Sequence, residues 1–188
     1  MILMKEINLL NNPHIFTEGE TEKNLISTLF LGRVRIVNLW NTNERALSSL
    51  FKFIDKKSTV VIVCDTDVVT DAHKNRFVSN IRKLVLATNN QVHILVQKLN
   101  FEDELAYAAG FKDKSQLYKA YKVEGEKDFK KKFSQSRNIR NDIKTLNIDI
   151  EKLWSRSTLS CFVTDPCFVS IREFISDSSC LRFRMQNS

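Results

Sequence analysis

An uninterrupted apolar run constrains the fold of this chain more than any other feature. Residues 58–64 read Ser-Thr-Val-Val-Ile-Val-Cys, and the chain turns polar at once with Asp65. A short run so rich in β-branched residues predicts a strand that is buried on both faces. Such strands are typical of parallel sheets that helices cover on both sides. We therefore expect an α/β fold.

The first hundred residues alternate between strand-like and helix-like segments. Strands are predicted at 14–17, 33–40, 58–64 and 91–99, and amphipathic helices at 20–31, 44–54 and 70–88. This β-α-β-α-β-α-β order with short connections predicts a mostly parallel, four-stranded, Rossmann-like sheet flanked by helices, with right-handed crossovers. We assign residues 1–110 to this domain and residues 111–188 to a mainly helical, basic C-terminal extension. The patterns at 1–10 and 161–188 favour no particular structure.

The charge balance favours a polyanionic partner. The chain carries 29 Lys and Arg against 22 Asp and Glu, a net charge of +7, and such an excess is typical of proteins that bind nucleic acid. The four cysteines form no C-x-x-C pair, and the three histidines do not fall at zinc-finger spacing. No segment has the roughly 18 apolar residues of a membrane span, and an early acid, Glu6, argues against a signal peptide. We expect a cytoplasmic protein with no membrane partner.

Acidic residues directly follow two of the predicted strands. Glu18 ends the first strand, Gly19 is expected to permit a tight turn, and Glu22 lies in the first turn of the next helix. Asp65 and Asp67 follow the third strand and point the same way, because side chains alternate along extended backbone. The carboxyl ends of parallel strands meet at one edge, where open α/β sheets bind ligands. Carboxylates gathered there predict a site for a hard divalent cation such as Mg²⁺ or Mn²⁺.

The two acidic motifs together resemble those of the Toprim domain. Glu-Gly-x-Thr-Glu at 18–22 follows a first strand, and Asp-x-Asp at 65–67 follows a third. Toprim domains occur in topoisomerases, primases, OLD-family nucleases and related small nucleases of phage-defence systems. The first motif is most similar to that of the OLD and RloB-like branch. The resemblance covers residues 10–110 and implies that the acids bind divalent metal for phosphodiester cleavage.

The resemblance implies a role for each acid of the two motifs. Glu18 matches the invariant glutamate of the family, a metal ligand or general acid/base, and Glu22 matches the second glutamate of the OLD-like motif. Asp65 and Asp67 match the metal-binding pair. Two cations could activate water and polarise the phosphate, or one cation could act together with a protonated Glu18.

Two further candidates lie near the end of the fourth predicted strand. Glu102, in the Phe-Glu-Asp-Glu turn, is similar to an additional metal-binding acid of the nuclease branch, with Asp103 and Glu104 as alternatives. Lys98 is the basic residue that the predicted sheet places near the phosphate, where it would stabilise developing negative charge.

The function implied by the resemblance is a Mg²⁺- or Mn²⁺-dependent endonuclease. Its substrate would be DNA or RNA, tRNA included, and its role that of a toxic effector in an antiviral, abortive-infection defence system. The chain has no Gly-rich Lys-Ser/Thr loop, so an ABC-type ATPase would have to be a separate partner. A homodimer is also left open.

Two other functions fit parts of the same pattern. A Toprim-like module could bind nucleic acid or a partner without cutting, through a basic stretch in which Phe129 and Phe133 either stack on bases or, as we expect, bury one helix face. Asp65 and Asp67 also fit the haloacid-dehalogenase pattern, in which the first Asp is a nucleophile towards phosphate. That pattern belongs on a first strand and leaves the first acidic motif without a role, so the nuclease is the preferred interpretation.

Overall fold

A four-stranded, all-parallel sheet forms the centre of the computed structural model, which describes residues 7–8, 12–66, 70–156, 165–176 and 181–182. Its strands are β2 (His14–Thr17), β3 (Arg33–Ile36), β4 (Val60–Cys64) and β5 (Val92–Val96), in the spatial order β3-β2-β4-β5. The first residue of β2 pairs with Arg33 on one side and with Val60 on the other, and Val60 pairs in turn with Val92. The predicted α/β fold with a parallel sheet is confirmed.

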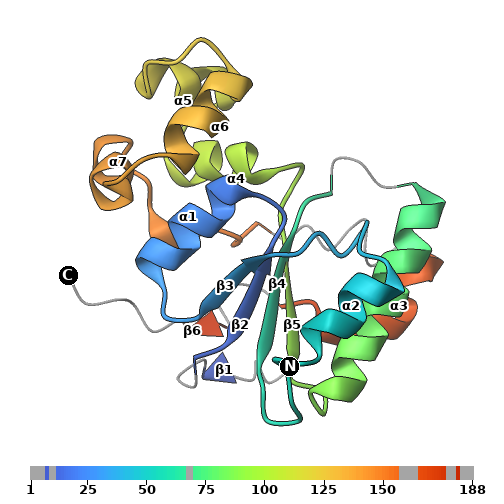
Figure 1. Cartoon of the computed structure of the whole chain (residues 1–188). Helices are drawn as coiled ribbons and strands as arrows, with labels where there is room; N and C mark the ends of the chain where they lie inside the picture. Colours follow the sequence, from blue (N-terminus) through green and yellow to red (C-terminus); the bar gives the residue numbers. More distant parts are fainter. Residues whose placement is uncertain (1–6, 9–11, 67–69, 157–164, 177–180, 183–188) are drawn as a thin grey trace, which may run out of the picture.

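Helices cover both faces of this sheet (Figure 1). One face carries α1 (Glu20–Leu29), α4 (Phe101–Ala108), α5 (Lys114–Ala120), α6 (Glu126–Ser134), α7 (Ile139–Thr145) and the 3₁₀ turn η1 (Ile150–Lys152). The other carries α2 (Glu44–Leu50), α3 (Asp71–Ala87) and the 3₁₀ segment η2 (Pro166–Phe174). A separate pair of short parallel strands joins β1 (Ile7–Asn8) to β6 (Leu181–Arg182). No helix in the described part of the chain is both long and apolar enough to cross a membrane.

The alternation of side chains along each strand divides the core into two clusters. Ile15 and Val61 point towards α1 and the helices that follow α4, whereas Phe16 and Ile62 point towards α3 and η2. All four side chains are buried. The two central strands, β2 and β4, are therefore buried on both faces, as their sequences predict.

The apolar core continues across residue 110, the predicted domain boundary. Phe129 and Phe133 of α6 have no exposed surface and belong to the same cluster as Leu25 and Ile26 of α1. The prediction that these two phenylalanines bury one helix face is confirmed. Because α6 packs on α1, the basic helices are held beside the carboxyl end of the first strand.

Two strands end earlier than predicted, and residues just beyond each end belong to the site. The strand predicted at 33–40 ends at Ile36, after which the chain turns through hydrogen bonds to Asn38 O. The strand predicted at 91–99 ends at Val96, and Leu99 has a φ of 67°, which no strand accommodates. In the first case the apolar residues that follow position 36 suggested more strand than the backbone forms.

Gly19 plays a smaller part than its sequence position suggests. It is the N-cap of α1 with φ −139° and ψ 170°, an extended conformation open to any residue. A Cβ built on it would lie 3.7 Å from a carboxylate oxygen of Glu22, which is ordinary contact. The turn therefore does not depend on a glycine at this position.

Candidate functional site

A hollow of about 450 Å³ opens where the strands end. Glu18 directly follows β2 and Asp65 directly follows β4, and both line it. The wall also includes Glu20 and Glu22 from α1, Glu102 from α4, and Lys130 and Lys131 from α6. The structure thus brings together four of the five predicted acids. The fifth, Asp67, lies outside the described residues.

Glu18 is held by three donors from two parts of the chain, the turn after β3 and the segment after β4. Its Oε1 accepts hydrogen bonds from Trp40 Nε1 at 2.8 Å and from the backbone N–H of Asp65 at 3.0 Å. Its Oε2 accepts one from Asn38 Nδ2 at 2.9 Å. The indole of Trp40 is itself fixed, because it stacks on Phe77 with ring centroids 3.9 Å apart. These bonds orient the carboxylate against the start of the Asp65 segment.

Glu22 is almost fully buried beside Glu18, with 3% of its surface exposed. Its Oε2 accepts the backbone N–H of Gly19 at 2.7 Å. Burial raises the pKa of the Glu22 carboxyl to about 8, the Gly19 hydrogen bond opposes this, and the negative charges of Glu18 and Glu102 add to it. In the absence of a cation, Glu22 therefore carries a proton at neutral pH.

Gln97 connects two of the acids from beneath. It is fully buried directly after β5. Its surroundings fix the orientation of its amide: the NH₂ group donates to Glu22 Oε1 at 2.8 Å and to Asp65 Oδ1, and the amide oxygen accepts Trp154 Nε1 at 3.2 Å. Gln97 is thus a positioning residue that holds the carboxylates of α1 and the β4 end together.

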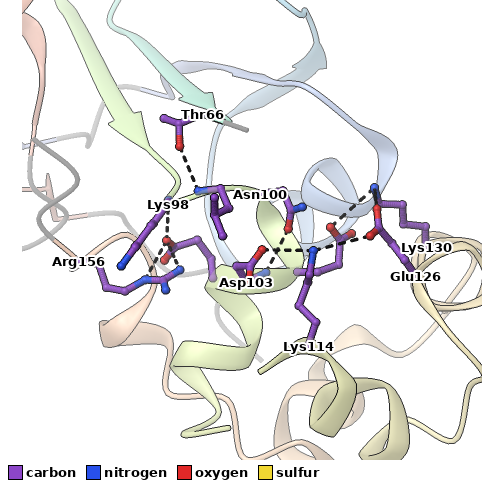
Figure 2. Close-up of polar contacts among 11 residues, drawn as sticks. Thr66, Lys98, Asn100, Asp103, Lys114, Glu126, Lys130 and Arg156 are labelled. Atoms are coloured by element: carbon purple, nitrogen blue, oxygen red, sulfur yellow. Dashed lines mark hydrogen bonds and ion pairs between the residues drawn. The ribbon is translucent and has the colours of Figure 1, made fainter. Parts of the chain in front are cut away.

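The three acids at the start of α4 separate into different environments (Figure 2). Asp103 lies 3.4 Å from Lys114 Nζ. Glu104 is fully buried and pairs with Arg156 at 2.6 Å. Glu102 alone among them lines the hollow. Its side chain is 1% exposed, and its Oε1 has no hydrogen-bond partner among the described residues. Burial raises the pKa of this carboxyl against the influence of Lys130.

Two lysines compete for the role of the basic residue. Lys98 is exposed and outside the wall of the hollow, and its backbone N–H donates to Glu104 at 3.0 Å (Figure 2). Lys130 lines the hollow, with Nζ 2.6 Å from Glu126 Oε1 and 3.7 Å from Glu102 Oε2. Burial alone would lower the pKa of its ammonium, but the Glu126 hydrogen bond and the Glu102 charge outweigh burial and raise it. Lys130 is therefore the cation that the fold directs at the acids.

Four residues of the site escaped sequence reasoning: Asn38, Trp40, Gln97 and Lys130. Asn38, Trp40 and Gln97 lay inside segments predicted as strand, and Lys130 belongs to no motif. Their common signal is a polar side chain just beyond an apolar run or on the polar face of a helix, which is too frequent to single out a site.

The described residues do not form a finished metal centre. No three His, Cys, Asp or Glu side chains in this part of the chain are grouped as ligands of one ion. The arrangement offers a concentration of carboxylate oxygens beside the ammonium group of Lys130, and Glu102 Oε1 has no hydrogen-bond partner among the described residues. Such a set can hold a hard cation or a proton and can orient an anionic ligand towards Lys130.

Comparisons of the chain with protein-family models, with curated proteins and with solved structures gave no match.

Proposed function

We propose that this protein is a metal-dependent nuclease of Toprim type that hydrolyses phosphodiester bonds of nucleic acid. The observation that carries the proposal is the meeting of acids from three distant segments around one hollow. Glu18 contacts the backbone of Asp65, and Glu22 and Glu102 line the same wall. The sequence resemblance further supports a role as the toxic effector of an antiviral defence system.

The acids fit a divalent cation in chemistry. They offer only carboxylate oxygens, the ligands that Mg²⁺ and Mn²⁺ prefer. Negative charge is concentrated there: burial is the main cause of the raised pKa of Glu22, the charges of Glu18 and Glu102 add to it, and Glu102 Oε1 has no hydrogen-bond partner among the described residues. Glu18, Glu22, Asp65 and Glu102 would hold the ion, and Asp67 stays a predicted ligand. When bound, the ion would polarise the phosphate and lower the pKa of an attacking water.

The groups around the acids position the carboxylates and stabilise charge on the phosphate. Trp40, Asn38 and Gln97 fix the carboxylates through hydrogen bonds, so that little rearrangement is needed during reaction. Lys130 directs its positive charge into the hollow, where it would stabilise negative charge that develops on the phosphate. We therefore assign to Lys130 the role that the sequence suggested for Lys98.

A second function has one observation in its favour. Both oxygens of Glu18 already accept hydrogen bonds, and no three-ligand group is assembled among the described residues. A module that binds nucleic acid without cutting it would need nothing more. Cleavage itself distinguishes the two functions.

The test uses the purified chain with labelled plasmid, single-stranded DNA and total RNA, each with Mg²⁺, Mn²⁺ or chelator. Glu18→Gln and Glu102→Gln are compared with Glu151→Gln, which changes an exposed acid on η1 outside the hollow. We expect metal-dependent products from the parent chain and Glu151→Gln, and a loss of at least about a hundredfold in the two site variants. Products that persist unchanged in Glu18→Gln would refute the site, and binding without products would favour the non-catalytic module.

A further inference from the structure

A second hollow lies on the other side of helix α6 from the acids. It measures about 390 Å³, and its wall includes Lys122, Lys131 and Lys132. Lys131 also lines the acidic hollow, so that one side chain borders both. Since a helix with its side chains is about 10–12 Å across, the two hollows lie within reach of one short stretch of nucleic acid.

The lysines of the second hollow are available for an anion. Lys122 and Lys131 are exposed and form no ion pair with any described residue, unlike Lys130. Glu124 and Asp128 also line this hollow, which leaves three cations against two anions there. The surrounding stretch has the same bias, with twelve Lys and Arg against seven Asp and Glu between positions 112 and 152. An extended polyanion gains from such a field over several of its charges.

The aromatic residues of this region are not available to stack on bases. Phe129 and Phe133 have no exposed surface, and Tyr121 is 8% exposed. Lys132 lies over the Tyr121 ring, with Nζ 4.7 Å from its centroid, and donates to the Tyr121 carbonyl at 2.9 Å. Stacking of bases on these rings is therefore excluded, and the lysines are placed for contacts with the sugar-phosphate backbone, which carries no sequence information.

We propose that a nucleic-acid strand leaves the acidic hollow across α6 at Lys131 and places a neighbouring phosphate in the second hollow, beside Lys122. The ligand is the phosphodiester backbone of a nucleic acid, recognised by charge and without base preference. This inference rests on the proposed function, because it assumes that the acidic hollow receives the scissile phosphate.

The test measures binding in chelator, so that cleavage plays no part. Fluorescence anisotropy with labelled single-stranded RNA, single-stranded DNA and duplex DNA gives the affinity over a range of salt concentrations. The double variant Lys122→Gln/Lys131→Gln removes two contacts, and each contact with a single strand contributes about 0.7 to the slope of log affinity against log salt. We expect that slope to become shallower by about 1.4, equally for different base sequences. The single-strand and duplex arms show which form follows the path.

The matched control is Lys56→Gln/Lys57→Gln, which removes the same charge from two exposed positions. These positions precede the amino end of β4, whereas the acidic hollow lies at its carboxyl end. Circular dichroism and thermal unfolding confirm that both variants fold. Equal slopes for the two double variants, or no salt-dependent binding by the parent chain, would overturn the inference. If the slopes differ as expected but no metal supports cleavage, the path stands and the proposed nuclease activity fails.

Discussion

Replacing Glu22 with glutamine measures how much the ionisation of this buried carboxyl destabilises the folded chain. The pKa of this buried carboxyl is raised to about 8 from its ordinary value of 4.5. The folded state holds this proton more tightly than the unfolded chain does. The contribution of Glu22 to the free energy of unfolding is therefore fully present below about pH 4.5. It is lost as the pH rises towards 8, where the folded carboxyl also ionises. Glutamine has no proton to lose, so Glu22→Gln escapes this loss.

The size of the effect follows from the pKa. Each pKa unit between the folded and unfolded states corresponds to about 1.4 kcal/mol. Between pH 5 and pH 9 the parent chain therefore loses on the order of 4 kcal/mol of unfolding free energy through Glu22 alone. The Gln97 NH₂ group donates to the Glu22 carboxylate in the parent chain, and the amide of Glu22→Gln has to accept this hydrogen bond in its place. Any cost of this rearrangement is the same at every pH. The informative quantity is therefore the change with pH in the difference between the unfolding free energies of the variant and the parent chain.

The measurement is urea-induced unfolding in chelator at several pH values, compared with Glu20→Gln, which changes an exposed acid on the same helix. We expect the stability of Glu22→Gln relative to the parent chain to rise with pH, and that of Glu20→Gln to stay flat. Added Mg²⁺ should raise the unfolding free energy of the parent chain most at high pH, because the cation neutralises the ionised carboxylates. Parallel stability curves for the parent chain and Glu22→Gln would show that burial and the neighbouring acids do not raise the pKa of Glu22.

Further predictions concern the basic group and the packing around β2. Lys130→Gln should lower the cleavage rate by about 10²–10³, as expected for a group that stabilises transition-state charge, whereas Lys98→Gln should leave it nearly unchanged; equal effects would refute the assignment. Gly32→Ala should cost about 1–3 kcal/mol in chemical unfolding, because its Cβ would lie 2.7 Å from the terminal methyl of buried Ile15. Gly125→Ala, which meets no atom within 4 Å, is the control, and a comparable loss there would contradict this explanation.

The sequence predicts the sheet and the place of its acids for a geometric reason. Apolar runs of four to eight residues separated by amphipathic helices leave few arrangements other than a parallel sheet. Parallel strands end at one edge, so acids that follow two such runs must lie near each other. The contact between Glu18 and the backbone of Asp65, at 3.0 Å, confirms this adjacency.

The sequence could not select among the acids of α4, because the selection is made by distant partners. Glu102, Asp103 and Glu104 occupy consecutive positions in one helical turn, and their local patterns are equivalent. Glu104 forms an ion pair with Arg156, and Asp103 forms one with Lys114. Glu102 is the acid of this turn that lines the hollow. The rotation of α4 depends on these tertiary contacts, which no local window of sequence contains. The same holds for Lys130, which reaches the site only because α6 packs on α1.

The two tryptophans of the chain provide a direct test of how the site is positioned. Trp40 and Trp154 are each 4% exposed, and each donates through its indole N–H, the first to Glu18 at 2.8 Å and the second to Gln97 at 3.2 Å. Replacing either with phenylalanine keeps most of the ring and removes the donor. A hydrogen bond to a charged group contributes about 1.5–3 kcal/mol, against about 0.5–1.5 kcal/mol for a neutral pair.

We therefore expect Trp40→Phe to lower the cleavage rate at least about tenfold, because Glu18 loses a donor that orients its carboxylate. Trp154→Phe should lower it less, since it acts on the acids only through the Gln97 amide. Both variants lose a similar volume of buried ring, so unfolding measurements on the same samples separate positioning from stability. Equal losses of activity, or a greater loss in Trp154→Phe, would mean that the orientation of Glu18 does not govern the reaction, and the proposed centre would then have to lie among the acids that Gln97 holds.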